Sequence, residues 1–200
     1  MSDHYYSENP AVQSSKKSWT FDLAGHAFTF RSDAGVFSKN EVDFGSRVLI
    51  DAFEMPDAEG SVLDMGCGYG PIGLAVAKKW PERHVDMADV NQRAVDLAKE
   101  NAELNKVENA SVFQSDLFSN AGEKQYAAIL SNPPIRAGKK TVHEILEKSF
   151  RHLCSGGELW VVIQKKQGAP SAAAKLEEVF GEVDIVLKKK GYYIIRAKKD

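Results

Sequence analysis

The sequence predicts an α/β fold in which a mostly parallel sheet is covered by helices on both faces. From Ser61 onward, strand-like and helix-like segments alternate strictly, which is typical of a parallel sheet. A glycine-rich turn follows the first strand of this series, and a closing hairpin makes the last strand antiparallel to its neighbour. No internal repeat or linker divides the chain, so we expect one globular unit.

Residues 1–54 are expected to form an N-terminal extension on a main domain over 55–200. Residues 1–18 are polar and aperiodic, which predicts a loosely held arm. Apolar and polar residues alternate on both sides of Ala24-Gly25, which predicts a small hairpin over 19–31. Apolar residues then recur at helical spacing, so we expect an amphipathic helix over about 43–54, packed on the core.

Within the main domain, five runs are strand-like: 61–65, 84–90, 110–114, 126–130 and 158–163. Four stretches between and after them are helical: 71–80, 91–105, 141–153 and 171–180. Two final strands, over 183–187 and 192–197, meet at a turn at Lys190-Gly191 and close the chain as a hairpin.

Composition limits the possible classes of protein. The 200 residues suit one domain, with 43% hydrophobic and 27% charged residues. No apolar run approaches membrane-spanning length, the N-terminus shows no signal peptide, and the two cysteines match no disulfide or metal framework. The five histidines form no metal motif either. We therefore expect a cytoplasmic monomer that binds no metal and no membrane.

The charge is not that of a dedicated nucleic-acid-binding protein, because the net charge is −2 and the pI is about 6.2. Any affinity for nucleic acid must come from local clusters of basic residues. The lysine groups at 16–17, 78–79, 165–166 and 188–190 are interpreted as ordinary solvated surface. The cluster from Arg136 to Lys140 is the exception, because it follows the candidate catalytic motif Asn132-Pro133-Pro134, which is described below.

A glycine-rich turn connects the strand over 61–65 to the helix over 71–80. Four glycines, at positions 66, 68, 70 and 73, fall within eight residues. Glycine allows positive φ and lets a ligand approach the backbone without meeting a Cβ. Pro71 suits the first turn of the following helix, where its missing N–H costs nothing. The segment therefore predicts a ligand-binding turn.

The residue before these glycines indicates which ligand binds. Gly68, Gly70 and Gly73 also match the dinucleotide pattern GxGxxG, which alone is a weak signal. Asp64, however, places a carboxylate at the strand end, where a pyrophosphate would be repelled. A cation with an ammonium and a sulfonium would be attracted, so Asp64 favours S-adenosylmethionine over NAD. An N-cap carboxylate with no ligand is the less favoured interpretation.

Acidic residues follow the next two strands. An acid at Asp89 can accept hydrogen bonds from ribose hydroxyls, while Asn91 is interpreted as the N-cap of the next helix. After the third strand, Asp116 can accept from an adenine amino group while Leu117 packs on the ring. All these positions lie at carboxyl ends of parallel strands, where open α/β sheets bind ligands.

The fourth strand is followed by Asn132-Pro133-Pro134. Two prolines stiffen the chain and remove backbone donors, so the segment presents acceptors, the Asn132 side-chain oxygen and the Pro133 carbonyl. Acceptors suit an –NH₂ nucleophile whose lone pair is delocalised, because a hydrogen bond to each N–H directs that lone pair at the methyl group. An ordinary turn is the alternative, since Asn and Pro are both favoured in turns.

Taken together, these motifs resemble class I S-adenosylmethionine-dependent methyltransferases of the Asn-Pro-Pro-aromatic type. The segments DAGVFSKNEVDFGSRVLI, LDMGCGYGPIG and SNPPIRAGK are most similar to the small-subunit ribosomal RNA guanine-N2 methyltransferase family, over about residues 35–200. The resemblance implies a Rossmann-like fold with a seven-stranded, mostly parallel sheet whose last strand is antiparallel. It also implies S-adenosylmethionine as cofactor and ribosomal RNA, or the small ribosomal subunit, as partner.

The resemblance also implies roles for particular residues. The region from Gly35 to Ser38, together with Asp43, is expected to line the cofactor pocket from the N-terminal side. Residues expected to contact the cofactor are Asp64, Gly66, Cys67, Gly68, Gly70, Asp89, Val90, Asp116, Leu117, Asn132 and Phe37. Those expected at the reacting amine are Asn132, Pro133, Pro134 and Ile135.

The sequence departs from this family pattern at two points. Ile135 stands where many relatives have an aromatic residue to stack on the base, so Phe37 or Tyr69 is a candidate for that ring. The ribosomal RNA enzymes often carry an additional N-terminal domain, whereas about 60 residues precede the glycine-rich turn here. Substrate recognition is therefore expected to use the basic cluster after the motif, with Arg136, Lys139 and Lys140 contacting phosphates.

Several functions remain open at this point. The leading hypothesis is methylation of guanine N2 in small-subunit ribosomal RNA. The same acceptors could serve a protein glutamine amide or a DNA base amine. A protein of another class, which senses S-adenosylmethionine and binds RNA without catalysis, is disfavoured by the intact Asn-Pro-Pro motif. An NAD-dependent oxidoreductase is last, because no proton relay accompanies the glycines.

Overall fold

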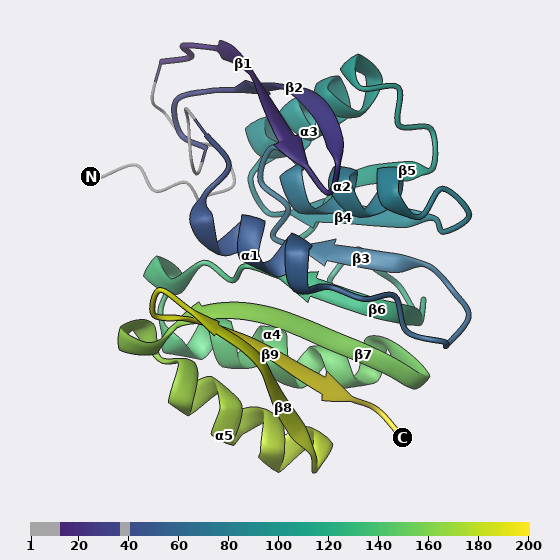
Figure 1. The fold of residues 1–200 in the computed structure, drawn as a ribbon, viewed down its shortest axis with the longest axis vertical. Helices are drawn as coiled ribbons and strands as arrows, with labels where there is room; N and C mark the ends of the chain where they lie inside the picture. The colour runs from purple at the N-terminus through teal and green to yellow at the C-terminus, as the bar shows by residue number, and fades with distance from the viewer. Residues whose placement is uncertain (1–12, 37–40) are drawn as a thin grey trace.

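The computed structural model describes residues 13–36 and 41–200. A seven-stranded sheet in the order β5-β4-β3-β6-β7-β9-β8 forms its centre, and a separate hairpin of β1 and β2 lies at the N-terminal end (Figure 1). Strand β9 is antiparallel to both of its neighbours, whereas the pairs from β5 to β7 are parallel. This confirms the predicted mostly parallel sheet with an antiparallel last strand.

The strands are β1 (Lys17–Leu23), β2 (His26–Ser32), β3 (Val62–Met65), β4 (Val85–Asp89), β5 (Ala110–Gln114), β6 (Tyr126–Ser131), β7 (Leu153–Gln164), β8 (Val183–Lys189) and β9 (Tyr192–Lys198). The helices are α1 (Phe44–Ala52), α2 (Pro71–Lys79), α3 (Gln92–Leu104), α4 (Lys139–His152) and α5 (Ala169–Phe180), with 3-10 turns η1 (Ile135–Ala137) and η2 (Lys165–Gln167). Within the two described ranges, no helix combines the length and the apolar composition needed to cross a bilayer.

The predicted boundary between the helix over 141–153 and the strand over 158–163 was wrong, because β7 begins at Leu153. Leu153 was expected to be the last apolar residue of the helix over 141–153, but it is the first residue of β7 and pairs with Tyr126 of β6. The helix passes directly into the strand, and the register then shifts between Tyr126 and Ala128. Leu153 lies at the end of the apolar face of the helix in sequence, so periodicity alone could not separate the two elements.

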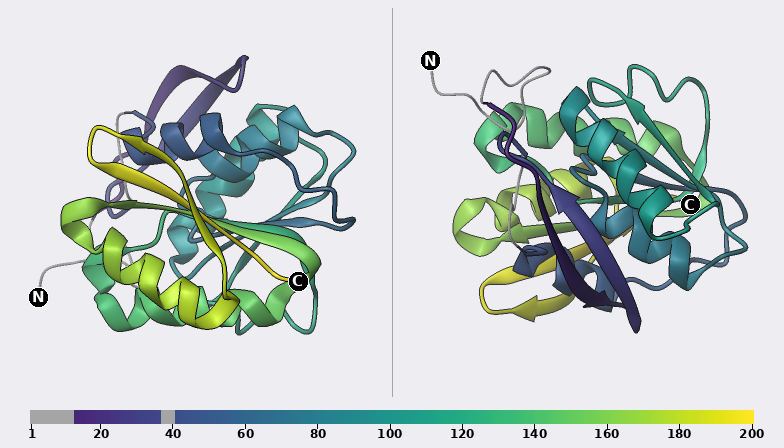
Figure 2. Two further views of the ribbon diagram at one scale, coloured as in Figure 1. Left: turned by 60° about the horizontal axis from the view of Figure 1, so that its bottom comes forward. Right: turned by 90° about the horizontal axis from the view of Figure 1, so that it is seen from above.

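Alternate strand residues face two separate layers of the core. Ala128 and Leu130 of β6 pack on the side of α1, α2 and α3, whereas Ile129 between them packs on the side of α4 and α5. The ribbon views show the same layers, with α4 and α5 covering the face opposite α1 (Figures 1 and 2). Both faces of the central strands are therefore buried, which explains their continuous apolar sequences.

The hairpin is attached to α3 by two asparagine side chains. Asn101 accepts from the Arg31 backbone N–H at 2.7 Å and donates to the Arg31 carbonyl at 2.9 Å. Asn105, one helical turn later, makes the same pair of bonds to Thr29 at 2.9 and 2.8 Å. Because Thr29 and Arg31 are two residues apart on β2, the two amides satisfy the strand edge as a neighbouring strand would.

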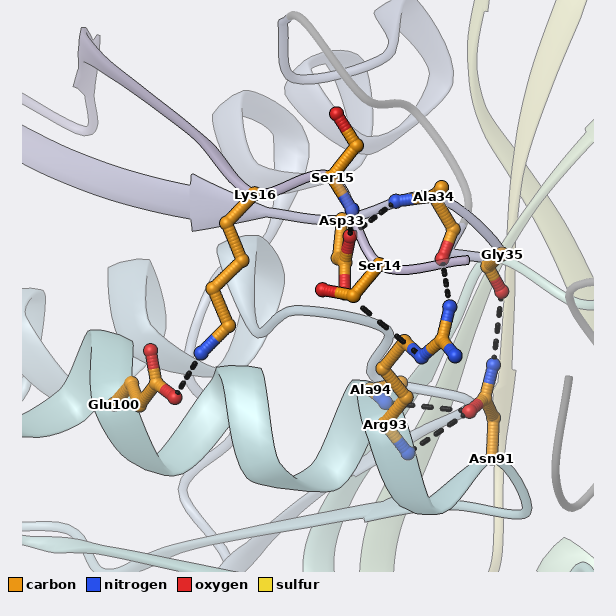
Figure 3. A network of polar contacts seen from close by, with 10 residues as sticks. All are labelled: Ser14, Ser15, Lys16, Asp33, Ala34, Gly35, Asn91, Arg93, Ala94 and Glu100. Carbon is orange, nitrogen blue, oxygen red and sulfur yellow. Dashed lines mark hydrogen bonds and ion pairs between the residues drawn. The ribbon is translucent and has the colours of Figure 1, made fainter. Parts of the chain in front are cut away.

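The end of the hairpin is held over the start of α3 by a polar network around Asp33 (Figure 3). The Asp33 carboxylate accepts from the Ser14 hydroxyl at 2.7 Å and from the Ala34 N–H at 2.7 Å, and Arg93 lies 3.8 Å away. Burial acts to raise the pKa of Asp33, but these hydrogen bonds and the Arg93 charge lower it overall. Asn91 donates to the Gly35 carbonyl at 3.0 Å. The network thus fixes the chain just before Val36.

Replacing Asn101 with alanine is expected to lower the free energy of unfolding by about 2–4 kcal/mol. The side chain is fully buried and also donates to the Tyr69 carbonyl at 2.8 Å, so its loss removes a hydrogen bond from each of three backbone groups. Urea unfolding measures the effect. Glu103→Ala, at an exposed position of the same helix, is the control and should change stability by less than about 0.5 kcal/mol.

Candidate active site

A cavity of about 330 Å³ opens at the carboxyl ends of β3, β4, β5 and β6. Both acidic and apolar groups line it, and they come chiefly from the glycine-rich turn, the ends of these four strands and the starts of α1 and α4. The lining residues are Val36, Asp43, Ser46, Met65, Gly66, Cys67, Gly68, Tyr69, Pro71, Ile72, Asp89, Val90, Ala94, Ser115, Asp116, Leu117, Asn132, Pro133, Pro134, Ala137, Thr141 and Ile145.

The turn after β3 brings bare backbone to the cavity wall. Gly66 and Gly68 have φ values of +76° and +57°, and a Cβ on either would meet no atom within 4 Å. Only glycine adopts this conformation readily, and the open space in front of both residues is cavity. Gly68 donates its N–H to Asp89 at 2.8 Å, which ties the turn to the end of β4.

Asp89 is held by backbone donors at the end of β4. One carboxylate oxygen accepts from Gly68 and the other from the Asn91 N–H at 2.9 Å, so both face fixed partners. Burial raises the pKa of Asp89, although its backbone hydrogen bonds act in the opposite direction. Asn91 caps α3 by accepting from Arg93 and Ala94, as predicted. The carboxylate of Asp89 keeps lone pairs for a hydroxyl donor in the cavity.

Asp64 lies behind the cavity wall and does not line it. One oxygen accepts from the Gly73 N–H of α2 at 2.8 Å, and the other, Oδ1, is buried without a partner among the described residues. Burial raises the pKa of Asp64 to about 7, the Gly73 N–H opposes this, and the Asp89 charge raises it further. The role of Asp64 in cofactor binding stays a prediction. Because Asp64 does not line the cavity, it could influence a bound cofactor only through the glycine-rich turn.

Asn132 is oriented by the N-terminus of α1. Its amide nitrogen donates to the Asp43 carboxylate at 3.1 Å and to the Ser46 hydroxyl at 3.1 Å. A carboxylate can only accept, so the amide must turn its –NH₂ toward Asp43 and its oxygen away. No residue of the described chain donates to that oxygen, which therefore stays available in the cavity. Asp43 also caps α1 by accepting from the Ser46 N–H at 3.2 Å.

The neighbouring segment is fixed from the other side. The Ser131 hydroxyl donates to the Met65 carbonyl at 2.8 Å, which joins the end of β6 to the end of β3. Pro133 and Pro134 follow and line the cavity beside Asn132. The Asn132 oxygen and the prolines thus face the same cavity as the glycine-rich turn. Two acceptors next to a nucleoside-sized cavity can hold an –NH₂ group.

The structure brings most of the predicted site residues together. The predicted residues that line the cavity are Gly66, Cys67, Gly68, Asp89, Val90, Asp116, Leu117, Asn132, Pro133 and Pro134, together with Asp43. Gly70 does not, because it faces α2, where a Cβ would come within 3.1 Å of Leu74. Phe37 and Ser38 lie outside the described residues. Tyr69 reaches the wall, but its ring packs against Trp19 and Phe30 in the core.

Ile135 and the basic cluster after it lie outside the cavity wall. Ile135 packs against the core beneath α4, and Arg136, Lys139 and Lys140 are exposed to solvent. They lie on η1 and the first turn of α4, next in sequence to Ala137 and Thr141, which line the cavity. Their predicted substrate contacts stay predictions. In residues 13–36 and 41–200, no cluster of three His, Cys, Asp or Glu side chains is arranged to hold a metal ion.

Sequence reasoning missed Ser46, whereas Val36 belongs to the predicted Gly35 to Ser38 region and lines the cavity. Ser46 lies three residues after Asp43, and the spacing of an N-cap acid and the third helical residue could have placed both at one site. Val36 reaches the cavity because the Asp33 network fixes the end of the hairpin, and no local pattern indicates that. Thr141 and Ile145 line the cavity as part of α4, and the helical pattern assigns them only to a helix face.

Comparison with known proteins identifies the family. The family model called methyltransferase small domain matches residues 27–196. The chain belongs to this family. YbxB of Bacillus subtilis is 64% identical over the whole length of both chains. Ribosomal RNA small subunit methyltransferase C of Vibrio cholerae is 37% identical over 92% of this chain and 53% of that protein.

Solved structures of methyltransferases agree with this assignment. The 16S rRNA N2 methyltransferase of T. thermophilus (RsmC), solved in complex with AdoMet and guanosine, has a TM-score of 0.83 and 25% identity. The match covers 96% of this chain and 52% of that one. A methyltransferase from Pyrococcus furiosus matches with a TM-score of 0.65. This chain thus spans about half the length of the ribosomal RNA enzymes that it matches. The structural matches confirm the predicted class I methyltransferase fold.

Asp64→Asn is expected to change how stability depends on pH. The folded state holds a proton on Asp64 up to about pH 7, whereas the unfolded chain releases it near the ordinary aspartate pKa of 3.8. The stability that this proton contributes is present below about pH 4 and is lost as the pH rises through about 7. The asparagine variant has no such loss.

Urea unfolding of both proteins between pH 4.5 and 7.5 (roughly the span of that window) tests this. The variant should gain stability relative to the wild type as the pH rises, by up to about 1.4 kcal/mol per pH unit. Parallel curves for the two proteins would contradict the assigned proton. The comparison isolates Asp64 because Asp89 is present in both proteins.

Proposed function

We propose that this protein transfers a methyl group from S-adenosylmethionine to an exocyclic amine of an RNA base, namely guanine N2 in small-subunit ribosomal RNA. The orientation of Asn132 carries the proposal. Its –NH₂ is held by Asp43 and Ser46, so the amide oxygen faces the cavity as an acceptor. An acceptor in that place suits an amine nucleophile and not a phosphate or a carboxylate.

The other half of the cavity fits the cofactor. Gly66 and Gly68 leave open space for a ligand, and Asp89 presents a carboxylate at the end of β4. Asp89 would hold the ribose hydroxyls, and Asp116 with Leu117 would hold the adenine. The Asp89 and Asp116 carboxyl groups line this part of the cavity, and their negative charge suits a cationic ligand. When bound, S-adenosylmethionine supplies a methyl group on a sulfonium centre that is already activated.

The residues of the amine site position the nucleophile. The Asn132 oxygen and the Pro133 carbonyl each accept one N–H of the target amine, which directs the nitrogen lone pair into the cavity. Because the methyl group is activated, this orientation supplies most of the catalysis and no strong base is needed. Both halves of the site come from one chain, so we propose that a monomer is sufficient and that no metal takes part.

The choice of RNA as substrate is supported by the relatives. The proteins named ribosomal RNA small subunit methyltransferase C share 33–37% identity with this chain, although each is about twice its length. The structure of the T. thermophilus enzyme contains guanosine. Arg136, Lys139 and Lys140 beside the mouth of the cavity are the proposed phosphate contacts. Pro134, which lines the cavity, would provide an aliphatic contact near the base in place of an aromatic ring.

Filter-bound transfer of tritium from labelled S-adenosylmethionine tests the proposal. The substrates are naked ribosomal RNA, isolated small subunits, DNA and a protein extract, and the labelled material is digested to nucleosides. We expect label in RNA that migrates as N2-methylguanosine. Label confined to protein or DNA would keep the chemistry but overturn the substrate. Cofactor binding without any transfer would instead support a sensing role.

Two substitutions test the amine site. Asn132→Ala is expected to lower kcat by about 100-fold or more, because the target amine loses one of its two acceptors. Asp43→Asn keeps the N-cap of α1 but can present its own –NH₂ to Asn132, so the amide is free to flip and kcat should fall about 10-fold. Calorimetry should find that the Kd for the cofactor changes less than kcat. Full activity of the Asn132→Ala variant would contradict the proposed mechanism.

A further inference from the structure

Three connections that leave the second half of the sheet carry only basic charge. We propose that they form a continuous surface that binds the RNA backbone next to the active site. This surface, called the basic rim, comprises Arg136, Lys139, Lys140, Lys165, Lys166, Lys188, Lys189 and Lys190. It rests on the proposed function, and it adds to that function the five lysines after β7 and at the end of β8.

The fold places all three connections at one edge of the sheet. Strands β6, β7 and β8 run in the same direction, so η1, η2 and the turn after β8 all follow carboxyl ends. Figures 1 and 2 show the β8–β9 turn beside the carboxyl end of β7 in each view. The Lys165 N–H donates to the Gly191 carbonyl at 2.8 Å, which joins η2 to that turn.

The rim reaches the catalytic amide through α1. The Lys190 ammonium lies 5.3 Å from the centre of the Phe44 ring, and Tyr192 lies 5.5 Å from the same ring. Phe44 directly follows Asp43, whose carboxylate accepts from Asn132 at 3.1 Å. The approach is close, because a Cβ on Gly45 would come within 2.9 Å of Tyr192. The turn of the rim is therefore packed against the helix that orients the catalytic asparagine.

The charge of the rim is not balanced locally. Residues 132–140, 164–171 and 187–192 contain eight basic and no acidic residues, in a chain with a net charge of −2. All eight side chains are exposed, and none forms an ion pair within the described part of the chain. At the opposite edge of the sheet, the connection from α1 to β3 carries Glu54, Asp57 and Glu59.

The kind of charge indicates a phosphate backbone. Lysine ammonium groups are point charges that attract phosphates without demanding a fixed geometry, and phosphate contacts position a nucleic acid without reading its sequence. Tyrosine rings lie among them, since Lys188 lies 4.9 Å from the centre of the Tyr193 ring. A repeating polyanion can contact all three connections at once. The rim and the Asn132 site share one edge, so a strand bound along the rim can deliver a base to the cavity.

Matched triple variants test the rim. The rim variant replaces Lys165, Lys166 and Lys189 with glutamine, and the control replaces Lys99, Lys106 and Lys198, which are exposed and lie outside the rim. Both variants change the net charge by the same amount, so a difference between them depends on position. Fluorescence anisotropy with a small-subunit ribosomal RNA fragment measures Kd at several salt concentrations, and cofactor binding by calorimetry checks that both variants retain the folded site.

The rim variant should bind the RNA about 10-fold or more weakly, with the same rise in KM for methyl transfer to RNA. The slope of log Kd against log salt should fall by about 2, because each lost phosphate contact contributes about 0.7–0.9. The control should stay within about twofold of the wild type. Cofactor affinity should not change in either variant.

The outcomes separate the rim from the function. If the wild type methylates RNA and the two variants bind RNA equally well, the rim is overturned and the proposed function stands. If the wild type labels only protein or DNA, the proposed function fails first. A loss of protein methylation in the rim variant alone would then mean that the rim holds an acidic protein, which overturns its assignment to RNA.

Discussion

The candidate active site depends on one chemical property of Asp43, whose carboxylate accepts hydrogen bonds and donates none. It caps α1 and accepts from the amide nitrogen of Asn132, so the same side chain fixes a helix and the direction of the Asn132 amide. An amide in a loop could otherwise present either its oxygen or its nitrogen to the cavity. Residues outside the Asn-Pro-Pro motif therefore decide whether the cavity presents an acceptor, which suits an amine, or a donor, which would suit a group that accepts hydrogen bonds.

Charge divides the carboxyl edge of the sheet into two halves. Asp89 ends β4 and Asp116 follows the end of β5, and both residues line the cavity. The only charged residues in the connections after β6, β7 and β8 are basic. A cationic cofactor and a polyanionic substrate would thus be attracted to adjacent regions of one edge. Asn132 lies where the two halves meet, which is where the methyl group would pass from one ligand to the other under the proposed function.

The N-terminal segment completes the site and is held by polar contacts as well as by apolar packing. Asn101 and Asn105 bind the edge of β2, and the Asp33 network holds the chain before Val36 over the start of α3. The same helix begins at Asn91, two residues after Asp89. The position of Val36 in the cavity wall therefore depends on the elements that carry the proposed ribose site.

The order and type of the elements can be predicted from the sequence, because period-2 and period-3.6 patterns reflect burial along one local segment. The sequence also identified the glycine-rich turn, Asp89 and Asn132, since each follows a strand whose carboxyl end was predictable. The position of Asp64 behind the cavity wall, and the orientation of Asn132 by Asp43 from 89 residues away, are visible only in the folded chain. The same is true of the lysine groups of the proposed rim, which the sequence alone assigns to solvated surface. Contacts between residues so far apart in the sequence depend on which strands become neighbours in the sheet, and no local sequence pattern specifies that.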